Sequence, residues 1–140
     1  MATRAELQKL AKLRLKEAEA LYRQKLYDGA AYLCGYSIEC ALKARICKLL
    51  DVADYPSKRQ NLKSAYTSHD LGQLLFLAGL SSGIGLTQPE LQQNWSIVAK
   101  WRSERRYDTP GKYSQRDALE VLDAIRSQPH GVLRWLMKRW

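Results

Sequence analysis

The chain has 140 residues, 46% of them hydrophobic, and its 23 Lys and Arg against 14 Asp and Glu give a formal net charge of +9. This hydrophobic content is enough to bury a core, which excludes a mostly disordered protein, and the length suits a single domain over residues 1–140. No apolar run approaches the roughly 18 residues of a membrane span, and the basic N-terminal segment lacks the apolar stretch of a secretory signal. We therefore expect a basic protein with no membrane-inserted segment.

An amphipathic helix is predicted over residues 2–24. This segment is rich in Ala, Leu, Lys, Glu and Arg, and its apolar residues recur at three- and four-residue steps. Thr3 and Glu6 have the spacing of a capping box at the start of this helix. The segment should therefore bury one apolar stripe and expose its charged face.

A second and more apolar helix is predicted over residues 29–50, after a short connection at residues 26–29. Asp28 is the expected N-cap. A helix that is apolar around most of its circumference is usually central, and a short connection makes two helices antiparallel neighbours. We therefore expect this helix to form the middle of a bundle.

Shorter elements are expected in the next part of the chain. Few core-type residues occur over 51–67, which is typical of a loop with at most one helical turn, and a third helix is predicted over 71–79. The Ser- and Gly-rich residues 81–85 should break it. Residues 87–90, Thr-Gln-Pro-Glu, combine capping-box spacing with a proline in the first turn, which predicts a helix that ends near Trp101.

The last part of the chain should contain a polar loop over residues 105–113 and then a helix capped by Ser114. Pro129 and Gly131 should end that helix before a short terminal helix over residues 132–138, which either packs on its own bundle or contacts a partner. No segment alternates with period two. The predicted fold class is an all-α up-and-down bundle of four to five main helices without a sheet.

Three cysteines, Cys34, Cys40 and Cys47, lie in the apolar second helix. Their spacing matches no common metal motif, and residues six or seven apart on one helix are too distant for a disulfide. With only two histidines in the chain, no His/Cys cluster is available either. We expect reduced thiols in a cytoplasmic protein, with no metal site and no cofactor.

The excess positive charge is concentrated in three segments. Residues 55–68 and 131–140 contain basic side chains but no acidic ones, and the segment from Lys100 to Lys112 holds five basic residues against Glu104 and Asp108. Such charge indicates either a solvated basic surface or a site for phosphate, nucleotide or nucleic acid.

Glu39 and Lys43 lie one turn apart on the second helix, in the order that favours a helical ion pair. They form either a surface pair or, because their neighbours are apolar, a partly buried one that needs a further polar partner. The arginines of a distant segment are candidates for that partner: Arg102, Arg105 and Arg106. Such a contact would build a polar groove.

The two histidines offer little catalytic chemistry. His69 lies at the predicted start of the third helix, beside Asp70, where a capping or surface role is more common than a role as a base. His130 lies between a proline and a glycine and should be exposed. No catalytic residue is assigned.

Four short segments, in order, resemble a HEPN domain. They are the connection at residues 26–31, the Glu-x-x-Leu-Lys-Ala-like stretch within residues 36–44, the His-Asp-Leu-x-x-Leu-Leu stretch at residues 69–75, and Arg-Tyr-Asp at residues 106–108. The resemblance spans roughly residues 3–128. It implies an all-α bundle that forms a homodimer, often with a minimal nucleotidyltransferase partner in a toxin–antitoxin or defence system.

Some HEPN domains are metal-independent ribonucleases in which an arginine is followed, after four to six residues, by histidine. No histidine follows Arg102, Arg105 or Arg106 at that spacing. The resemblance therefore implies a non-catalytic module that binds a nucleotide or RNA through these residues: Arg102, Arg105, Arg106, Tyr107, Lys43, Glu39 and His69. The alternatives are a ribonuclease toxin with a degenerate site, in which Tyr107 or His69 replaces the base, and a pure assembly subunit.

Overall fold

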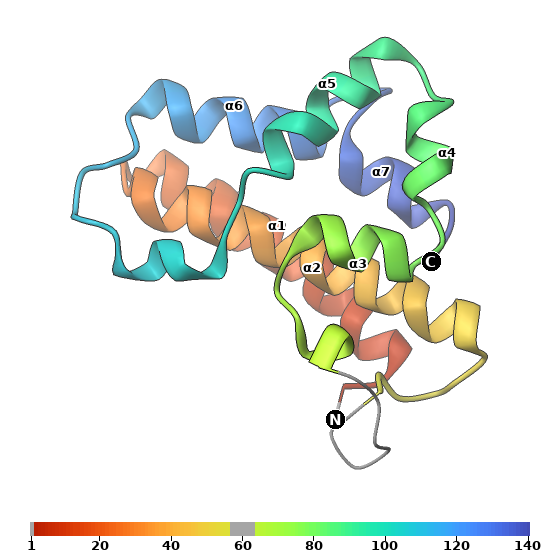
Figure 1. Cartoon of the computed structure of the whole chain (residues 1–140). Coiled ribbons are helices and arrows are strands. Elements are labelled where there is room, and N and C mark those ends of the chain that lie inside the picture. The colour runs from red at the N-terminus through yellow and green to blue at the C-terminus, as the bar shows by residue number, and fades with distance from the viewer. Residues whose placement is uncertain (1, 57–63) are drawn as a thin grey trace.

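The computed structural model describes residues 2–56 and 64–140, and the structural statements below concern these residues (Figure 1). The basic residues Lys58, Arg59 and Lys63 lie outside the described part. The described residues are helical and contain no strand, so the predicted all-α bundle is confirmed. The α-helices are α1 (Arg4–Arg23), α2 (Tyr27–Leu50), α3 (Leu71–Leu77), α4 (Ser81–Gly85), α5 (Pro89–Val98), α6 (Gln115–Arg126) and α7 (Val132–Met137), and the 3₁₀ turns are η2 (Ser64–Thr67) and η3 (Ser103–Tyr107).

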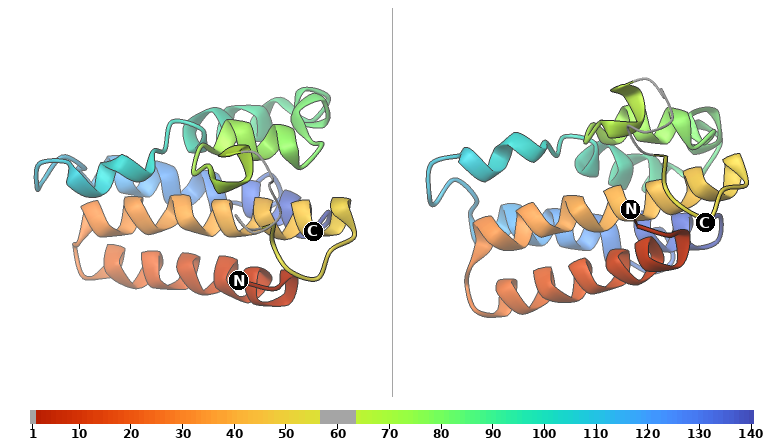
Figure 2. Two further views of the ribbon diagram at one scale, coloured as in Figure 1. Left: turned by 60° about the horizontal axis from the view of Figure 1, so that its bottom comes forward. Right: turned by 90° about the horizontal axis from the view of Figure 1, so that it is seen from below.

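The two longest helices, α1 and α2, run side by side in opposite directions along most of their length (Figure 2). The predicted capping box at the start of α1 is present: the Glu6 amide donates to Thr3 Oγ1 at 3.1 Å, and the Thr3 amide donates to Glu6 Oε2 at 2.7 Å. Between the helices, the buried Ser37 hydroxyl donates to the carbonyl oxygen of Ala11 at 2.7 Å. Because a buried hydroxyl is costly without a partner, this bond favours one relative position of the two helices.

Helix α2 is the centre of the bundle, as its apolar sequence predicts. It contacts α1, α3, α6, α7 and η3. Its cysteines are free thiols. Burial raises the pKa of Cys34 to about 12 and that of Cys40 to about 11, so both thiols are protonated at neutral pH and behave as small apolar groups.

The predicted start of the second helix is wrong in its detail. Helix α2 begins at Tyr27, and its N-cap, Leu26, makes no side-chain capping bond. Asp28 lies inside the first turn, and its carboxylate accepts from the amides of Gly111 and Tyr113 instead. A contact with a distant loop thus replaces the local cap.

The predicted break after the third helix is present, but residues 81–85 are themselves helical and form α4. The helix start at Pro89 is confirmed, whereas the capping box at Thr87 is not. Gln88 is the N-cap of α5, and the Thr87 hydroxyl donates backwards to the carbonyl oxygen of Ile84 at 2.5 Å. Thr87 therefore satisfies a carbonyl of α4 rather than an amide of α5.

The C-terminal helix α7 packs on its own bundle, as one of the two interpretations of this segment predicts. Its buried residues are Val132, Leu133, Trp135 and Leu136. The predicted polar loop is also partly helical, because residues 103–107 form η3. Among the described residues, no helix combines the length and the apolar character that crossing a bilayer requires.

One close contact joins the α5–η3 segment to α2. Gly35 has no side chain, and a Cβ atom there would lie 2.0 Å from Cε2 of Trp101. The buried Trp101 indole occupies that space and donates from Nε1 to the carbonyl oxygen of Tyr32 at 3.0 Å. Tyr36 completes the contact, with its ring edge-on to Trp101 at a centroid distance of 5.0 Å.

We expect Gly35→Ala to lower the free energy of unfolding by about 1–3 kcal/mol, because the added methyl group displaces the Trp101 ring. This loss should exceed the gain of up to ~1 kcal/mol that alanine brings to a helix interior. Urea unfolding followed by circular dichroism measures the change. Gly83→Ala is the matched control, since no atom lies within 4 Å of a Cβ there. Equal stabilities of the two variants would contradict the proposed role of the contact.

Candidate functional site

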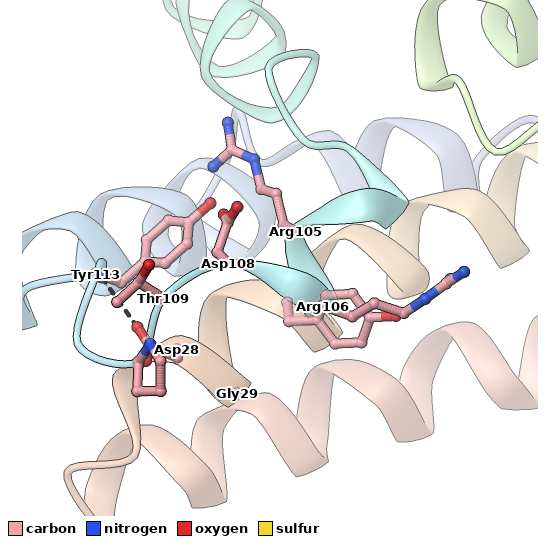
Figure 3. Close-up of a pocket in the computed structure, with 9 residues that line it drawn as sticks. Asp28, Gly29, Arg105, Arg106, Asp108, Thr109 and Tyr113 are labelled. Atoms are coloured by element: carbon pink, nitrogen blue, oxygen red, sulfur yellow. Dashed lines mark hydrogen bonds between the residues drawn. The ribbon is translucent and has the colours of Figure 1, made fainter.

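A pocket of about 380 Å³ lies between η3, the loop that follows it, and the first turns of α2 (Figure 3). We call it the η3–α2 pocket. Two segments of the chain form it, although they are about 80 positions apart in the sequence. The lining residues are Asp28, Gly29 and Tyr32 from α2, Arg105 and Arg106 from η3, and Asp108, Thr109, Pro110 and Tyr113 from the loop.

Two anchors hold the pocket wall in place. The first is the Trp101 indole, which fixes the chain just before η3 on the Tyr32 turn of α2. The second is the Asp28 carboxylate, which accepts from the Gly111 amide at 2.6 Å and from the Tyr113 amide at 2.9 Å. Gly111 has a φ of 85°, a left-handed conformation that glycine adopts without steric cost. The loop is therefore tied at both ends to one helix.

The two pocket carboxylates are already engaged by the protein. Both oxygens of Asp28 accept backbone amides, as described above. Asp108 Oδ2 is buried without a hydrogen bond, but Lys112 Nζ lies 3.5 Å away, within ion-pair distance. The two amides and the Lys112 ammonium group thus partly compensate the negative charges of Asp28 and Asp108.

The two pocket arginines have no carboxylate partner among the described residues. Arg105 donates from Nη2 to the carbonyl oxygen of Lys100 at 2.8 Å, and its guanidinium group lies 5.4 Å from the centre of the Tyr113 ring. The guanidinium group of Arg106 lies 4.8 Å from the centre of the Tyr107 ring. The two side chains point in different directions from η3 (Figure 3). Each is a planar cation beside an aromatic face, an arrangement suited to phosphate groups and bases.

Two tyrosines continue this surface along α2. The hydroxyl groups of Tyr32 and Tyr36 are 3.0 Å apart. Burial and the hydrogen bond with Tyr32 raise the pKa of Tyr36 to about 12, and the nearby Arg106 acts in the opposite direction. Tyr36 is therefore a neutral hydroxyl at physiological pH, available as a donor or an acceptor.

A second polar cluster lies farther along the same helix. Glu39 is only 5% exposed, and its Oε1 lies 2.6 Å from Nδ1 of His69. Its Oε2 lies 3.5 Å from Nζ of Lys43, which in turn is 5.1 Å from the centre of the Tyr55 ring. A buried carboxylate is costly unless it is paired, and here two cationic or potentially cationic groups pair with it.

The pocket and the Glu39 cluster share one face of α2. Tyr32, Tyr36, Glu39 and Lys43 follow each other at steps of three and four residues, which places them on one stripe of a helix. Tyr36 lies between the two groups, since both Glu39 and Arg106 act on its pKa. We call Tyr32, Tyr36, Glu39 and Lys43 the α2 stripe.

The expected contact between Glu39 and the arginines is wrong. Glu39 is paired by Lys43 and His69, whereas Arg105 and Arg106 lie at the pocket. Arg102 belongs to neither group, because its Nη1 donates to the carbonyl oxygens of Ala99 and Trp101, each at 2.9 Å. Its side chain thus satisfies carbonyls at the end of α5.

Of the predicted binding residues, Arg105 and Arg106 line the pocket, and the exposed ring of Tyr107 lies beside Arg106. Glu39, Lys43 and His69 form the second cluster. Tyr32 and Tyr113 also line the pocket, which was not predicted from the sequence. Tyr32 and Tyr36 lie one helical turn apart, a spacing that predicts contact between their two rings.

Within residues 2–56 and 64–140, no group of three or more His, Cys, Asp or Glu side chains is placed to hold a metal ion. A family model described as the HEPN domain matches residues 5–128 of the chain. No curated protein and no solved structure gave a significant match.

Proposed function

Because this chain belongs to the HEPN domain family, which makes it a nucleotide- or RNA-related module in general terms, we propose that it is a non-catalytic module of the cytoplasm that binds a nucleotide or single-stranded RNA at the η3–α2 pocket. The observation that carries this proposal is the presence of two arginines that have no carboxylate partner in the described part of the chain, each beside a tyrosine ring.

In the proposed binding mode, the arginines bind the phosphate groups of the ligand and a tyrosine ring stacks on one of its bases. Arg105 and Arg106 contact phosphate oxygens, since a guanidinium group can donate two parallel hydrogen bonds to a phosphate. The Tyr107 ring is 78% exposed and offers a face on which a base can stack. Asp28 and Asp108 do not oppose this mode, because amides and Lys112 already engage them.

We propose a non-catalytic role because no suitable proton acceptor lies beside the arginines of the η3–α2 pocket. RNA cleavage by a 2′-hydroxyl needs a general base within hydrogen-bonding reach. The segment that carries the arginines, residues 102–113, contains no histidine. His69 belongs to the Glu39 cluster, and Tyr36, with its raised pKa, is a poor proton acceptor at neutral pH.

We expect the double variant Arg105→Gln/Arg106→Gln to bind a fluorescently labelled short RNA at least about tenfold more weakly than the unmodified chain, because charge-assisted hydrogen bonds are lost. Fluorescence anisotropy at several salt concentrations measures the affinity, and the salt dependence should become shallower in the variant. Arg102→Gln removes one arginine charge outside the pocket, so it is the matched control for each of the single variants Arg105→Gln and Arg106→Gln, which are measured beside the double variant. No binding at low salt, or an equal loss in Arg102→Gln and the two single variants, would refute the assignment.

We further propose that the chain forms a homodimer and associates with a minimal nucleotidyltransferase in a toxin–antitoxin or defence system. The resemblance to the HEPN family supports this proposal.

Light scattering coupled to size exclusion should give twice the mass of one chain, and coexpression with a minimal nucleotidyltransferase should give a larger complex. Because α7 is part of the bundle core, the dimer should be tested on the whole chain rather than on a C-terminal truncation. A monomeric mass at high protein concentration would contradict the dimer.

RNA cleavage is a second candidate function, which one observation favours. The carboxylate of Glu39 holds Nδ1 of His69 at 2.6 Å, and the His69 side chain is 49% exposed. A carboxylate that orients an imidazole in this way leaves Nε2 free to accept a proton. Lys43 lies on the same carboxylate and supplies positive charge near a reacting phosphate.

If the chain cleaves RNA, His69→Gln should lower the rate by about 10²–10⁴-fold, the usual contribution of a general base. A cleavage assay in the presence of a metal chelator measures this, and His130→Gln serves as the control for histidine loss elsewhere. Absence of cleavage by the unmodified chain, or an unchanged rate in His69→Gln, rejects this candidate and leaves the binding proposal standing.

A further inference from the structure

A second pocket, of about 350 Å³, lies between the turn that enters α5 and the C-terminal helix α7. These two elements lie toward the other end of the bundle from η3 (Figure 1). We call this second pocket the α5–α7 pocket. It shares no residue with the η3–α2 pocket. Part of its wall is apolar and comprises Leu86, Leu91, Pro129 and Trp135.

The rest of the wall is polar: Thr87, Gln88 and His130 line it together with three basic side chains. Arg134, Lys138 and Arg139 line the pocket, and no Asp or Glu lines it. Arg134 donates to the side-chain oxygen of Gln128, which is neutral. None of the three cations is paired with a carboxylate in the described part of the chain, so they create a positive potential over an apolar surface.

Arg139 is the most constrained of these cations. Its guanidinium group lies 4.2 Å from the centre of the Trp135 ring, and its Nη1 donates to the carbonyl oxygen of Trp135 at 2.9 Å. Burial and the neighbouring charge of Arg45 lower the pKa of Arg139. An anion beside it would offset both the lost hydration and the repulsion.

Trp135 contributes its ring to the pocket wall, and its indole nitrogen is a buried donor. Trp135 lines the pocket and is only 9% exposed, and its Nε1 is buried without a hydrogen-bond partner in the described residues. A buried indole N–H usually finds an acceptor, because an unmade hydrogen bond in the interior is costly. The protein encloses this donor, so a ligand in the pocket would pack against the indole ring rather than hydrogen-bond to its nitrogen.

We propose that the α5–α7 pocket binds a small organic anion whose phosphate or carboxylate group contacts the basic side chains and whose aromatic body packs on the apolar wall. The site does not depend on the function proposed above, because it lies in a different part of the fold. Its size suits a ligand with one ring and one charged group rather than a polymer.

Nuclear magnetic resonance of the indole N–H groups tests this proposal directly. The chain has four tryptophans, so the Trp135 signal is identified by its loss in Trp135→Phe. Phenyl phosphate and benzoate are the two anionic probes, inorganic phosphate lacks the ring, and benzyl alcohol lacks the charge. We expect the Trp135 signal to shift with the anionic probes at lower concentrations than with inorganic phosphate or benzyl alcohol.

The variant Arg134→Gln/Lys138→Gln removes two exposed charges, so the fold should be retained. It should weaken phenyl phosphate binding at least about tenfold, which corresponds to the loss of one charge-assisted contact. Arg106→Gln, in the other pocket, is the control and should leave the Trp135 shift unchanged. The proposal is overturned by the absence of any Trp135 shift, by an equal response to benzyl alcohol or inorganic phosphate, or by unchanged binding in the double variant.

Discussion

The contact of the Trp101 indole with the bare backbone of Gly35 is the constraint on which the candidate site depends. It lets a large ring lie directly on α2 and donate to the carbonyl oxygen of Tyr32. Because Trp101 lies two residues before the start of η3, its position constrains where Arg105 and Arg106 lie relative to α2. The Asp28 carboxylate then holds the far end of the loop, so the pocket wall has two fixed points on one rigid element.

Helix α2 contributes residues both to the hydrophobic core and to the candidate functional site. Most of its circumference packs against α1, α3, α6 and α7, and the α2 stripe is the part left for polar chemistry. Glu39 is buried there only because Lys43 and His69 pair with it. The stripe thus has an aromatic end, Tyr32 and Tyr36, beside η3 and a charged end, Glu39 and Lys43, beside the start of α3. Tyr36 lies between the two ends, and both Glu39 and Arg106 act on its pKa.

Part of the net positive charge gathers at two separate pockets of the fold, which the amino-acid composition does not show. Part of it faces the η3–α2 pocket, where tyrosine rings accompany the arginines. Another part surrounds the α5–α7 pocket, where the accompanying surface is apolar and includes the ring of Trp135. Cations beside tyrosines suit a phosphate with a stacked base, whereas cations beside an apolar wall suit a compact organic anion. The same excess charge therefore supports two different kinds of recognition.

The all-α class, the central apolar helix, the capping box at Thr3, the helix starts at Pro89 and Ser114, and the pairing of Glu39 with Lys43 could all be predicted from the sequence. They follow from periodicity and local hydrogen bonding, which act between residues a few positions apart. The contact of Glu39 with His69, the role of Asp28 in holding a loop, and the contribution of Tyr32 and Tyr113 to the pocket became visible in the tertiary structure alone. Each of these depends on which distant backbone or side chain arrives next to a residue, and no local pattern in the sequence encodes that arrangement.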